Sequence, residues 1–346
     1  MHLFRRTLLF AALGIAAACA STPPPPPPPL GTLVVLSKRE ASAMWYDLDA
    51  RHERQRAATG VGPHEAAARD ELVVVCDYGA QAPGSTLTVL DASTGRLVRT
   101  LALGHERPHG IEWIDDRSVL VTSEASDAVL EVDVLAGAVT RVLPTGAELS
   151  HMLRISPDRS RVFTTNMQSN TLSAIDLSSG SLIAQVPTGK GPEALDISPD
   201  GCEVWVGNRN DDTLSVFDAR SLELLATLPC PRFPIRLAFT RNGRHVLVSC
   251  AQSGDLAVFD ARARKEARRI ALDLTPTESA AQNLLGRDFA ASPTPIGILI
   301  HPTAPRAYIA ATNADLVSEL SLDTWTFLAR IPTAPEPDGL AWLPAR

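Results

Sequence analysis

A unit of about forty residues recurs along the chain, and this repeat constrains the fold more than any other feature of the sequence. Residues 161–201 show the unit most clearly, with short apolar runs at Val162–Thr165, Thr171–Asp176, Ser181–Val186 and Leu195–Ser198. Asn, Ser-Gly, Pro-Thr-Gly and Pro-Asp-Gly separate these runs and supply the backbone conformations that tight turns need. Apolar runs of this length between turn residues are typical of strands. Each unit is therefore expected to form a four-stranded antiparallel meander.

Seven copies of the unit account for nearly all of the chain. The copies are Gly31–Glu71, Leu72–Arg117, Ser118–Ser160, Arg161–Gly201, Cys202–Gly243, Arg244–Pro305 and Arg306–Arg346. Four strands per repeat at this period predict an all-β fold, a seven-bladed β-propeller that forms one domain over residues 31–346. The last run, Pro337–Leu343, has no partner in its own copy. We expect it to close the ring by pairing with the first blade, which removes a sheet edge.

The strand sequences resemble the YVTN-repeat family of β-propellers. Val204–Asn208 (VWVGN) and Val246–Cys250 (VLVSC) are similar to the family's VYVAN-like strand, and Leu214–Asp218 (LSVFD) is similar to its VSVID-like strand. The resemblance begins near Gly31 and extends to the end of the chain. It implies the propeller fold and says almost nothing of function, because one fold hosts many activities.

The first thirty residues predict export and a membrane anchor. Met1–Ala20 has a basic start, an apolar run too short to span a bilayer, and the sequence Ala-Ala-Ala-Cys, which looks like the lipobox of a bacterial lipoprotein signal peptide. In that interpretation Cys19 is lipidated, whereas ordinary secretion with cleavage after Ala20 is the alternative. Residues 21–30 form a Pro-rich linker whose polyproline II conformation would span about 20 Å. The predicted location is the periplasmic or cell-surface face of a bacterial membrane.

Composition and missing motifs exclude several function classes. The formal net charge is −7, which argues against nucleic-acid binding because such binding relies on Lys and Arg that neutralise phosphates. The chain has no phosphate-binding Gly loop, no G-x-S-x-G motif, no C-x-x-C pair and no H-E-x-x-H motif. No carboxylate pair can be assigned an acid and a base role from the sequence.

One position near the start of each innermost strand collects polar residues. Aligned on the preceding residue, which is Pro in six copies and Ser150 before His151, the seven positions are His64, His109, His151, Glu193, Ile235, Ile296 and Asp338. In a propeller these positions meet at one mouth of the central channel. Further candidates for the rim of this mouth are Asp77, Asn166, Asn208 and Arg236. Three imidazoles at one mouth suit Zn or Cu, and His64, His109 and His151 are the candidate metal ligands. Buried imidazoles between blades, or a solvated polar ring, are the alternatives.

Other recurrent or unusual residues have simpler explanations. Most third strands end in Asp, and we expect this carboxylate to tie the following turn. An insertion between the sixth and seventh blades, Leu274–Thr294, contains residues 277–289, whose apolar spacing predicts a short helix. Among the cysteines, Cys230 and Cys250 are the pair expected to form a disulfide in an oxidising compartment, and four buried thiols are the alternative.

The sequence therefore favours an exported, lipid-anchored propeller that acts as a non-catalytic scaffold for a protein or a small-molecule ligand through its channel mouth and rim loops. A metal- or cofactor-dependent enzyme that uses the His-rich ring is the second hypothesis, and a DNA-binding propeller is the third. We expect a monomer that contacts the membrane through its N-terminal lipid. The sequence identifies neither the ligand nor the partner.

Overall fold

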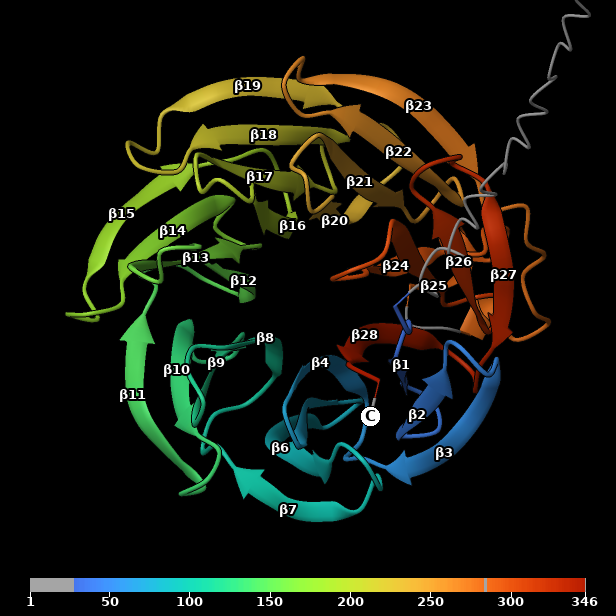
Figure 1. Ribbon diagram of the computed structural model, residues 1–346. Coiled ribbons are helices and arrows are strands. Elements are labelled where there is room, and N and C mark those ends of the chain that lie inside the picture. The colour runs from blue at the N-terminus through green and yellow to red at the C-terminus, as the bar shows by residue number, and fades with distance from the viewer. Residues whose placement is uncertain (1–27, 283–284, 346) are drawn as a thin grey trace, which may run out of the picture.

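The computed structural model describes residues 28–282 and 285–345. The predicted signal peptide, Cys19 and most of the linker lie outside these residues. Seven four-stranded sheets stand around a central axis in the described part of the chain (Figure 1). The seven-bladed propeller with antiparallel blades is therefore confirmed.

The strands take equivalent places in every blade. The innermost strands are β28 (Pro337–Leu343), β4 (Pro63–Arg69), β8 (Pro108–Trp113), β12 (Ser150–Ile155), β16 (Pro192–Ile197), β20 (Pro234–Phe239) and β24 (Pro295–Ile300). The second strands are β1 (Thr32–Ser37), β5 (Leu72–Gly79), β9 (Ser118–Ser123), β13 (Arg161–Asn166), β17 (Glu203–Asn208), β21 (His245–Cys250) and β25 (Arg306–Ala311). The third strands are β2 (Ser42–Asp47), β6 (Pro83–Asp91), β10 (Ala128–Asp133), β14 (Thr171–Asp176), β18 (Thr213–Asp218), β22 (Asp255–Asp260) and β26 (Leu316–Ser321). The outer strands are β3 (His52–Ala58), β7 (Leu97–Ala102), β11 (Ala138–Pro144), β15 (Leu182–Pro187), β19 (Leu224–Pro229), β23 (Lys265–Ala271) and β27 (Phe327–Pro332).

The hydrophobic core lies between the blades. The second strands are buried along nearly their whole length, whereas the outer strands alternate between exposed and half-buried residues. Both faces of a second strand pack against neighbouring sheets, so its side chains are apolar at consecutive positions. One buried cluster, for example, joins Leu33 and Met44 of the first blade to Tyr308 and Val317 of the seventh. Burial between blades therefore holds the ring together.

The C-terminal strand closes the ring. Strand β28 pairs antiparallel with β1, with Leu33 opposite Trp342 and Val35 opposite Leu340 (Figure 1). The expected pairing of the last strand with the first blade is confirmed. The pairing also places Thr32 beside Leu343, where the innermost strand ends. We call this side of the ring, with the turns that follow the innermost strands, the linker face, and the opposite side the mouth face.

The Asp residues of the third strands tie turns on the linker face, as expected. The Asp176 carboxylate accepts a hydrogen bond from the Ser179 amide, and the Asp91 carboxylate accepts from the amides of Ser93 and Thr94. The hydroxyls of Ser93 and Thr94 also donate to Asp91, and those of Ser178 and Ser179 donate to Asp176. Together these bonds lower the pKa of Asp91 and of Asp176 to about 2. The recurrent Asp is a device of the fold rather than a set of sites.

The insertion before β24 differs from the sequence expectation. In place of a helix over residues 277–289, the described residues form two short 3-10 helices, η1 (Ala280–Gln282) and η2 (Arg287–Phe289). Gly286, which lies before η2, has a φ of 73°, and this conformation does not continue a right-handed helix.

The described residues contain no helix with the length and apolarity needed to cross a membrane.

Candidate functional site

Three imidazoles lie side by side at the mouth face. His64, His109 and His151 come from the starts of β4, β8 and β12, which are the innermost strands of three successive blades. The ring centroids of His64 and His109 are 4.0 Å apart, and those of His109 and His151 are 3.7 Å apart. The sequence alignment of these positions therefore identified residues that are in contact. The Tyr78 ring packs against this row, with its centroid 5.1 Å from that of His64.

His109 occupies the middle of the row and has no polar partner. Its side chain is fully buried, and neither Nδ1 nor Nε2 has a hydrogen-bond partner among the described residues. Burial and the neighbouring His151 and His64 hold the pKa of His109 well below its usual range, so the ring is neutral. A buried polar group without a partner costs about 1–3 kcal/mol, and such groups are rare in folded proteins. His109 is therefore the most unusual residue of the site.

His151 is held between two carboxylates. Its Nδ1 lies 2.5 Å from Oε1 of Glu124, and its Nε2 lies 3.3 Å from Oε1 of Glu193. Burial opposes protonation, but the contacts with Glu124 and Glu193 outweigh it and raise the pKa of His151. Glu124 also accepts a hydrogen bond of 2.6 Å from the Tyr78 hydroxyl. His151 is thus the imidazole of the row that carries a proton most readily.

His64 faces a different carboxylate. Its Nδ1 lies 3.0 Å from Oδ2 of Asp338, the residue that follows Pro337 in the closing strand β28. The Lys38 ammonium at the end of β1 forms an ion pair with the same carboxylate. Burial alone would raise the pKa of Asp338, but Lys38 and His64 lower it below its usual range. Burial and Lys38 together lower the pKa of His64 despite Asp338. Ring closure therefore completes one side of the site.

A buried ion-pair network completes the other side. Arg236 Nη1 lies 2.8 Å from Oε1 of Glu193, and Arg236 Nη2 lies 3.0 Å from Oε1 of Glu65. Arg209 forms a further ion pair with Glu193. Burial favours the uncharged form of Glu193, but Arg209, His151 and Arg236 hold its pKa well below the usual range.

The charges of this network balance only when one imidazole is protonated. Lys38, Arg209 and Arg236 are the cations, and they face four carboxylates, Glu65, Glu124, Glu193 and Asp338. A proton on His151 supplies the missing positive charge. His64 and His109 then stay neutral, and neutral imidazole is the form that binds metals.

The remaining predicted positions lie elsewhere or serve their own blade. Ile235 and Ile296 pack with Ala251 and Phe289 in an apolar cluster under the insertion. Asp77 accepts hydrogen bonds from the hydroxyls of Thr86 and Thr88. Asn166 and Asn208 each donate to a Thr and a Ser of their own third strand; these four residues are Thr171, Ser173, Thr213 and Ser215. The structure brings Arg236 and Asp338 to the histidines. Asp77, Asn166 and Asn208 instead lie near the ends of second strands and bind residues of their own blades.

The alignment on Pro missed several residues of the site. Lys38 and Glu124 lie at or just past the ends of second strands, which also reach the mouth face. Glu65 directly follows His64, and Arg209 follows Asn208. The ends of the second strands carry the only sequence signal for Lys38, Glu124 and Arg209, since they lie beside the starts of the innermost strands.

His109 belongs to both groups of residues at this site that could hold a metal ion. Two groups of three residues bring ligand atoms within 4.8 Å of one another, namely His109 with Glu124 and His151, and His109 with His64 and Glu65. Imidazole and carboxylate together are the ligands of zinc and copper sites in proteins. In the second group the carboxylate of Glu65 is paired with the Arg236 guanidinium, whereas Glu124 of the first group is bound by His151 and by the Tyr78 hydroxyl.

The axial channel continues beyond this site. A cavity of about 360 Å³ lies among the innermost strands, and Glu65, Glu112, Arg154 and Arg236 are its charged lining residues. The three histidines do not line this cavity. The exposed fractions of His64, His109 and His151 are 7%, 0% and 6%. The imidazole row is therefore almost closed to solvent on both sides.

Comparisons with known proteins agree with the fold. Residues 108–220, which begin at β8 and end just after β18, match the profile of the YNCE-like β-propeller family. The match confirms the resemblance to YVTN-type propellers. No curated protein matches the chain.

Two solved structures show the same architecture. One is described as a functionally unknown protein from Desulfotomaculum acetoxidans, with a TM-score of 0.74 and 14% identity over 91% of this chain and 100% of that chain. The other is the hydrazine synthase of Kuenenia stuttgartiensis, with a TM-score of 0.69 and 17% identity over 81% of this chain and 89% of that chain. At these identities the similarity shows the fold alone.

Proposed function

We propose that this protein is an exported, lipid-anchored β-propeller that binds a divalent transition-metal ion at its channel mouth. The observation that carries the proposal is the state of His109, a fully buried imidazole between two others, with no partner for either ring nitrogen. Coordination of an ion would give one of these nitrogens a partner. Zinc and copper suit a site of imidazoles and carboxylate.

The proposed ligands are His109, His151 and Glu124, with His64 on the other side of His109. A metal ion would replace the proton that His151 and Glu124 share. Metal binding releases protons from its ligands, and a divalent ion in place of this proton raises the charge of the network by one. Glu193 and Arg236 would orient His151 from outside the coordination sphere, as second partners of ligating histidines commonly do.

The near-complete burial of the imidazole row favours a binding function over a catalytic one. A catalytic metal keeps an open coordination position that the substrate reaches. Here Tyr78 covers the row on one side, and the Glu65–Arg236 ion pair separates it from the axial cavity. The propeller would thus hold the ion, and its rim loops would remain available to a protein partner or another ligand.

Metal titration of the full chain, purified in detergent without a histidine tag, tests the proposal. We expect one equivalent of Zn²⁺ or Cu²⁺ to bind, as measured by calorimetry and by elemental analysis after dialysis. His109→Gln should abolish binding, and Glu124→Gln should weaken it by about tenfold or more through loss of a charged ligand. Glu65→Gln, the same change in the other group of three, is the matched control and should bind nearly as the wild type does. A wild-type protein that binds neither ion would refute the proposal, and so would a His109→Gln variant with unchanged affinity.

Export and anchoring rest on the signal sequence and on the place where the linker meets the ring. The Leu30 carbonyl accepts hydrogen bonds of 2.7 Å from His301 Nε2 and from Trp342 Nε1, so the linker joins the ring at the linker face. The test is expression in a bacterial host with a radiolabelled fatty acid. The wild-type chain should carry the label and sediment with membranes, and Cys19→Ser should lose the label. An unlabelled wild-type chain in the soluble fraction would contradict the anchor.

A further inference from the structure

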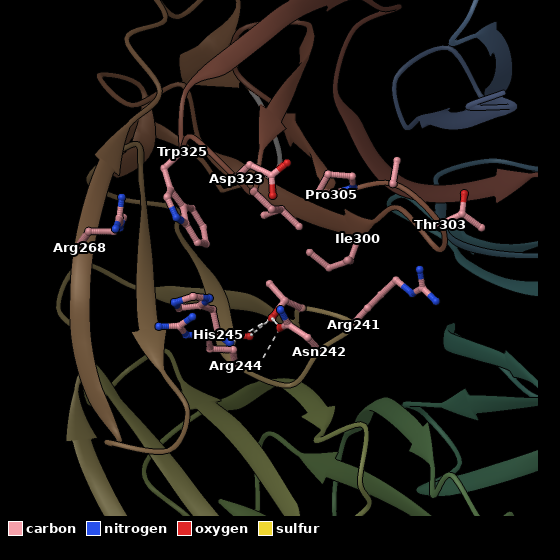
Figure 2. Close-up of a pocket in the computed structure, with 13 residues that line it drawn as sticks. Arg241, Asn242, Arg244, His245, Arg268, Ile300, Thr303, Pro305, Asp323 and Trp325 are labelled. Carbon is pink, nitrogen blue, oxygen red and sulfur yellow. Dashed lines mark hydrogen bonds between the residues drawn. The ribbon is translucent and has the colours of Figure 1, made fainter. Parts of the chain in front are cut away.

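A pocket of about 530 Å³ opens on the linker face between the sixth and seventh blades (Figure 2). Its walls are the turn between β20 and β21, the loop between β24 and β25, and the turn between β26 and β27. Arg268 of the outer strand β23 lies at its edge. None of its lining residues belongs to the imidazole row or to the axial cavity. The pocket is therefore independent of the proposed metal site.

Three arginines line this pocket, and their guanidinium groups have no carboxylate partner among the described residues. They are Arg241, Arg244 and Arg268, and all three are exposed. Elsewhere on this face, by contrast, Arg264 forms an ion pair with Glu203. Asp323 is the acidic residue of the pocket lining. The pocket is thus a positively charged place on a chain whose formal net charge is −7.

Trp325 organises one end of the pocket. The Arg268 guanidinium lies 4.9 Å from the centre of the Trp325 ring, a cation–π contact. The His245 ring meets Trp325 edge-on, with 5.0 Å between the centroids. Figure 2 shows Arg268, Trp325, His245 and Arg244 at this end, and Arg241 at the other. The indole holds Arg268 in place, so less side-chain entropy is lost when Arg268 binds a ligand.

The titration of His245 reflects this positive surrounding. Burial, Arg244 and Arg268 lower the pKa of His245, and only Asp260 acts in the opposite direction. A bound anion would weaken the effect of the two arginines on the pKa of His245. The His245 ring is therefore a reporter for whatever occupies the pocket.

We propose that this pocket binds a phosphate group. Guanidinium groups bind phosphate through paired N–H donors, and a phosphate can accept from more than one arginine at once. Three arginines against one aspartate leave a charge of +2 in the lining, which matches a phosphate dianion.

The phosphate has two potential sources, a soluble phosphorylated compound or an anionic lipid headgroup. The loop between β24 and β25 lines the pocket and also carries His301, which binds Leu30 where the linker joins the ring. The pocket therefore opens on the face where the linker joins the ring. The lipid source therefore rests on the proposed anchoring, whereas phosphate binding itself does not.

Calorimetric titration of the full chain in a neutral detergent with inorganic phosphate tests the pocket. We expect saturable binding, and the double variant Arg244→Ala with Arg268→Ala should weaken it by about tenfold or more. The matched control is Arg220→Ala with Arg262→Ala, which removes the same charge from exposed turns of the same face outside the pocket. A second readout is the His245 ring resonance, whose titration should move to higher pH when phosphate is bound.

Short-chain lipids that stay monomeric distinguish the two sources. Dihexanoyl phosphatidylglycerol is the anionic probe, and dihexanoyl phosphatidylcholine is the zwitterionic control. Binding of dihexanoyl phosphatidylglycerol with the same dependence on Arg244 and Arg268 supports a headgroup site. Binding of inorganic phosphate without binding of this lipid supports a soluble ligand. The proposal is overturned if neither probe binds, or if the pocket variant and the control variant lose affinity equally.

Discussion

The imidazole ring of His109 stacks on that of His151, with 3.7 Å between their centroids and 37° between their planes. The two side chains come from different blades, and they differ in their hydrogen-bond partners. His151 shares its Nδ1 with Glu124, whereas His109 has no polar partner among the described residues. This asymmetry makes the pair suitable for an ion that joins both rings.

Metal binding should stabilise the folded protein. A ligand present at 100 times its dissociation constant adds about 2.7 kcal/mol to the free energy of unfolding. We expect Zn²⁺ to raise the thermal midpoint of the wild type, as measured by circular dichroism. The midpoint of His109→Gln should not move when Zn²⁺ is added. An equal increase in both proteins would place the stabilising ion elsewhere.

Loss of the last strand should destabilise the whole ring. Removal of residues 337–346 deletes β28, leaves β1 as an open edge and exposes the buried residues that contact Leu340 and Ala341. The thermal midpoint should fall in a single cooperative transition. Removal of residues 344–346 alone, which follow β28, is the control and should leave the midpoint nearly unchanged. A truncated chain with the wild-type midpoint would contradict the closure.

Cys230 and Cys250 should form a disulfide under oxidising conditions. Both thiols are buried and free, and their Sγ atoms are 3.9 Å apart. A cross-link of this loop length adds about 3 kcal/mol in the chain-entropy account. Mass spectrometry of the oxidised protein should show the loss of two hydrogens, and the thermal midpoint should rise. Cys230→Ala should remove both effects, and Cys76→Ala should preserve the mass change. Free thiols that persist at Cys230 and Cys250 after oxidation would exclude the pair.

Acid should weaken the turns of the linker face. The pKa of Asp91 and of Asp176 is about 2 in the folded protein because hydroxyl and amide groups of the following turn bind the carboxylates. The unfolded chain has the ordinary value of about 3.9, so it binds more protons between these values. The stabilisation is therefore present above pH 4 and is lost as the pH falls toward 2.

Urea unfolding at pH 5 and pH 3 measures this dependence. The difference between the two pH values should be smaller in Asp91→Asn with Asp176→Asn than in the wild type. Asp70→Asn, a change at another exposed carboxylate of the same face, is a control and should keep most of the wild-type difference. An undiminished difference in the double variant would assign the acid sensitivity to other groups.

The sequence predicted the fold in detail because the repeat specifies each blade through local signals. Turn residues and apolar runs identify the four strands, and the unpaired run at 337–343 identifies the closure. The prediction of a helix in the insertion was wrong. It rested on apolar spacing alone and left out Gly286, whose positive φ does not continue a right-handed helix. The insertion occurs in one blade only, so the repeat carries no information about its conformation.

The site could be predicted only in part. The aligned position, which follows Pro in six copies and Ser150 in the other, identified His64, His109 and His151. It also selected Ile235, but Arg236 takes the polar role in that blade. The pairing of β20 with β21 shifts register between Pro234 and Arg236, and similar shifts occur at the starts of other innermost strands. A shift of one residue changes which side chain faces the axis. The partners Glu124 and Arg209 required the relative rotation of neighbouring blades, which no local pattern specifies.

The junction between the linker and the ring has a mechanical consequence. Chain tension applied through residues 21–30 enters the protein at Leu30 and Thr32, where His301 and Trp342 bind the Leu30 carbonyl. Strand β1 then passes the load to β2 on one side and to β28 on the other. Two hydrogen-bonded ladders resist the pull together, whereas a terminal edge strand would peel along one ladder. A propeller hung from a surface by this end would bear shear forces without unravelling from its point of attachment.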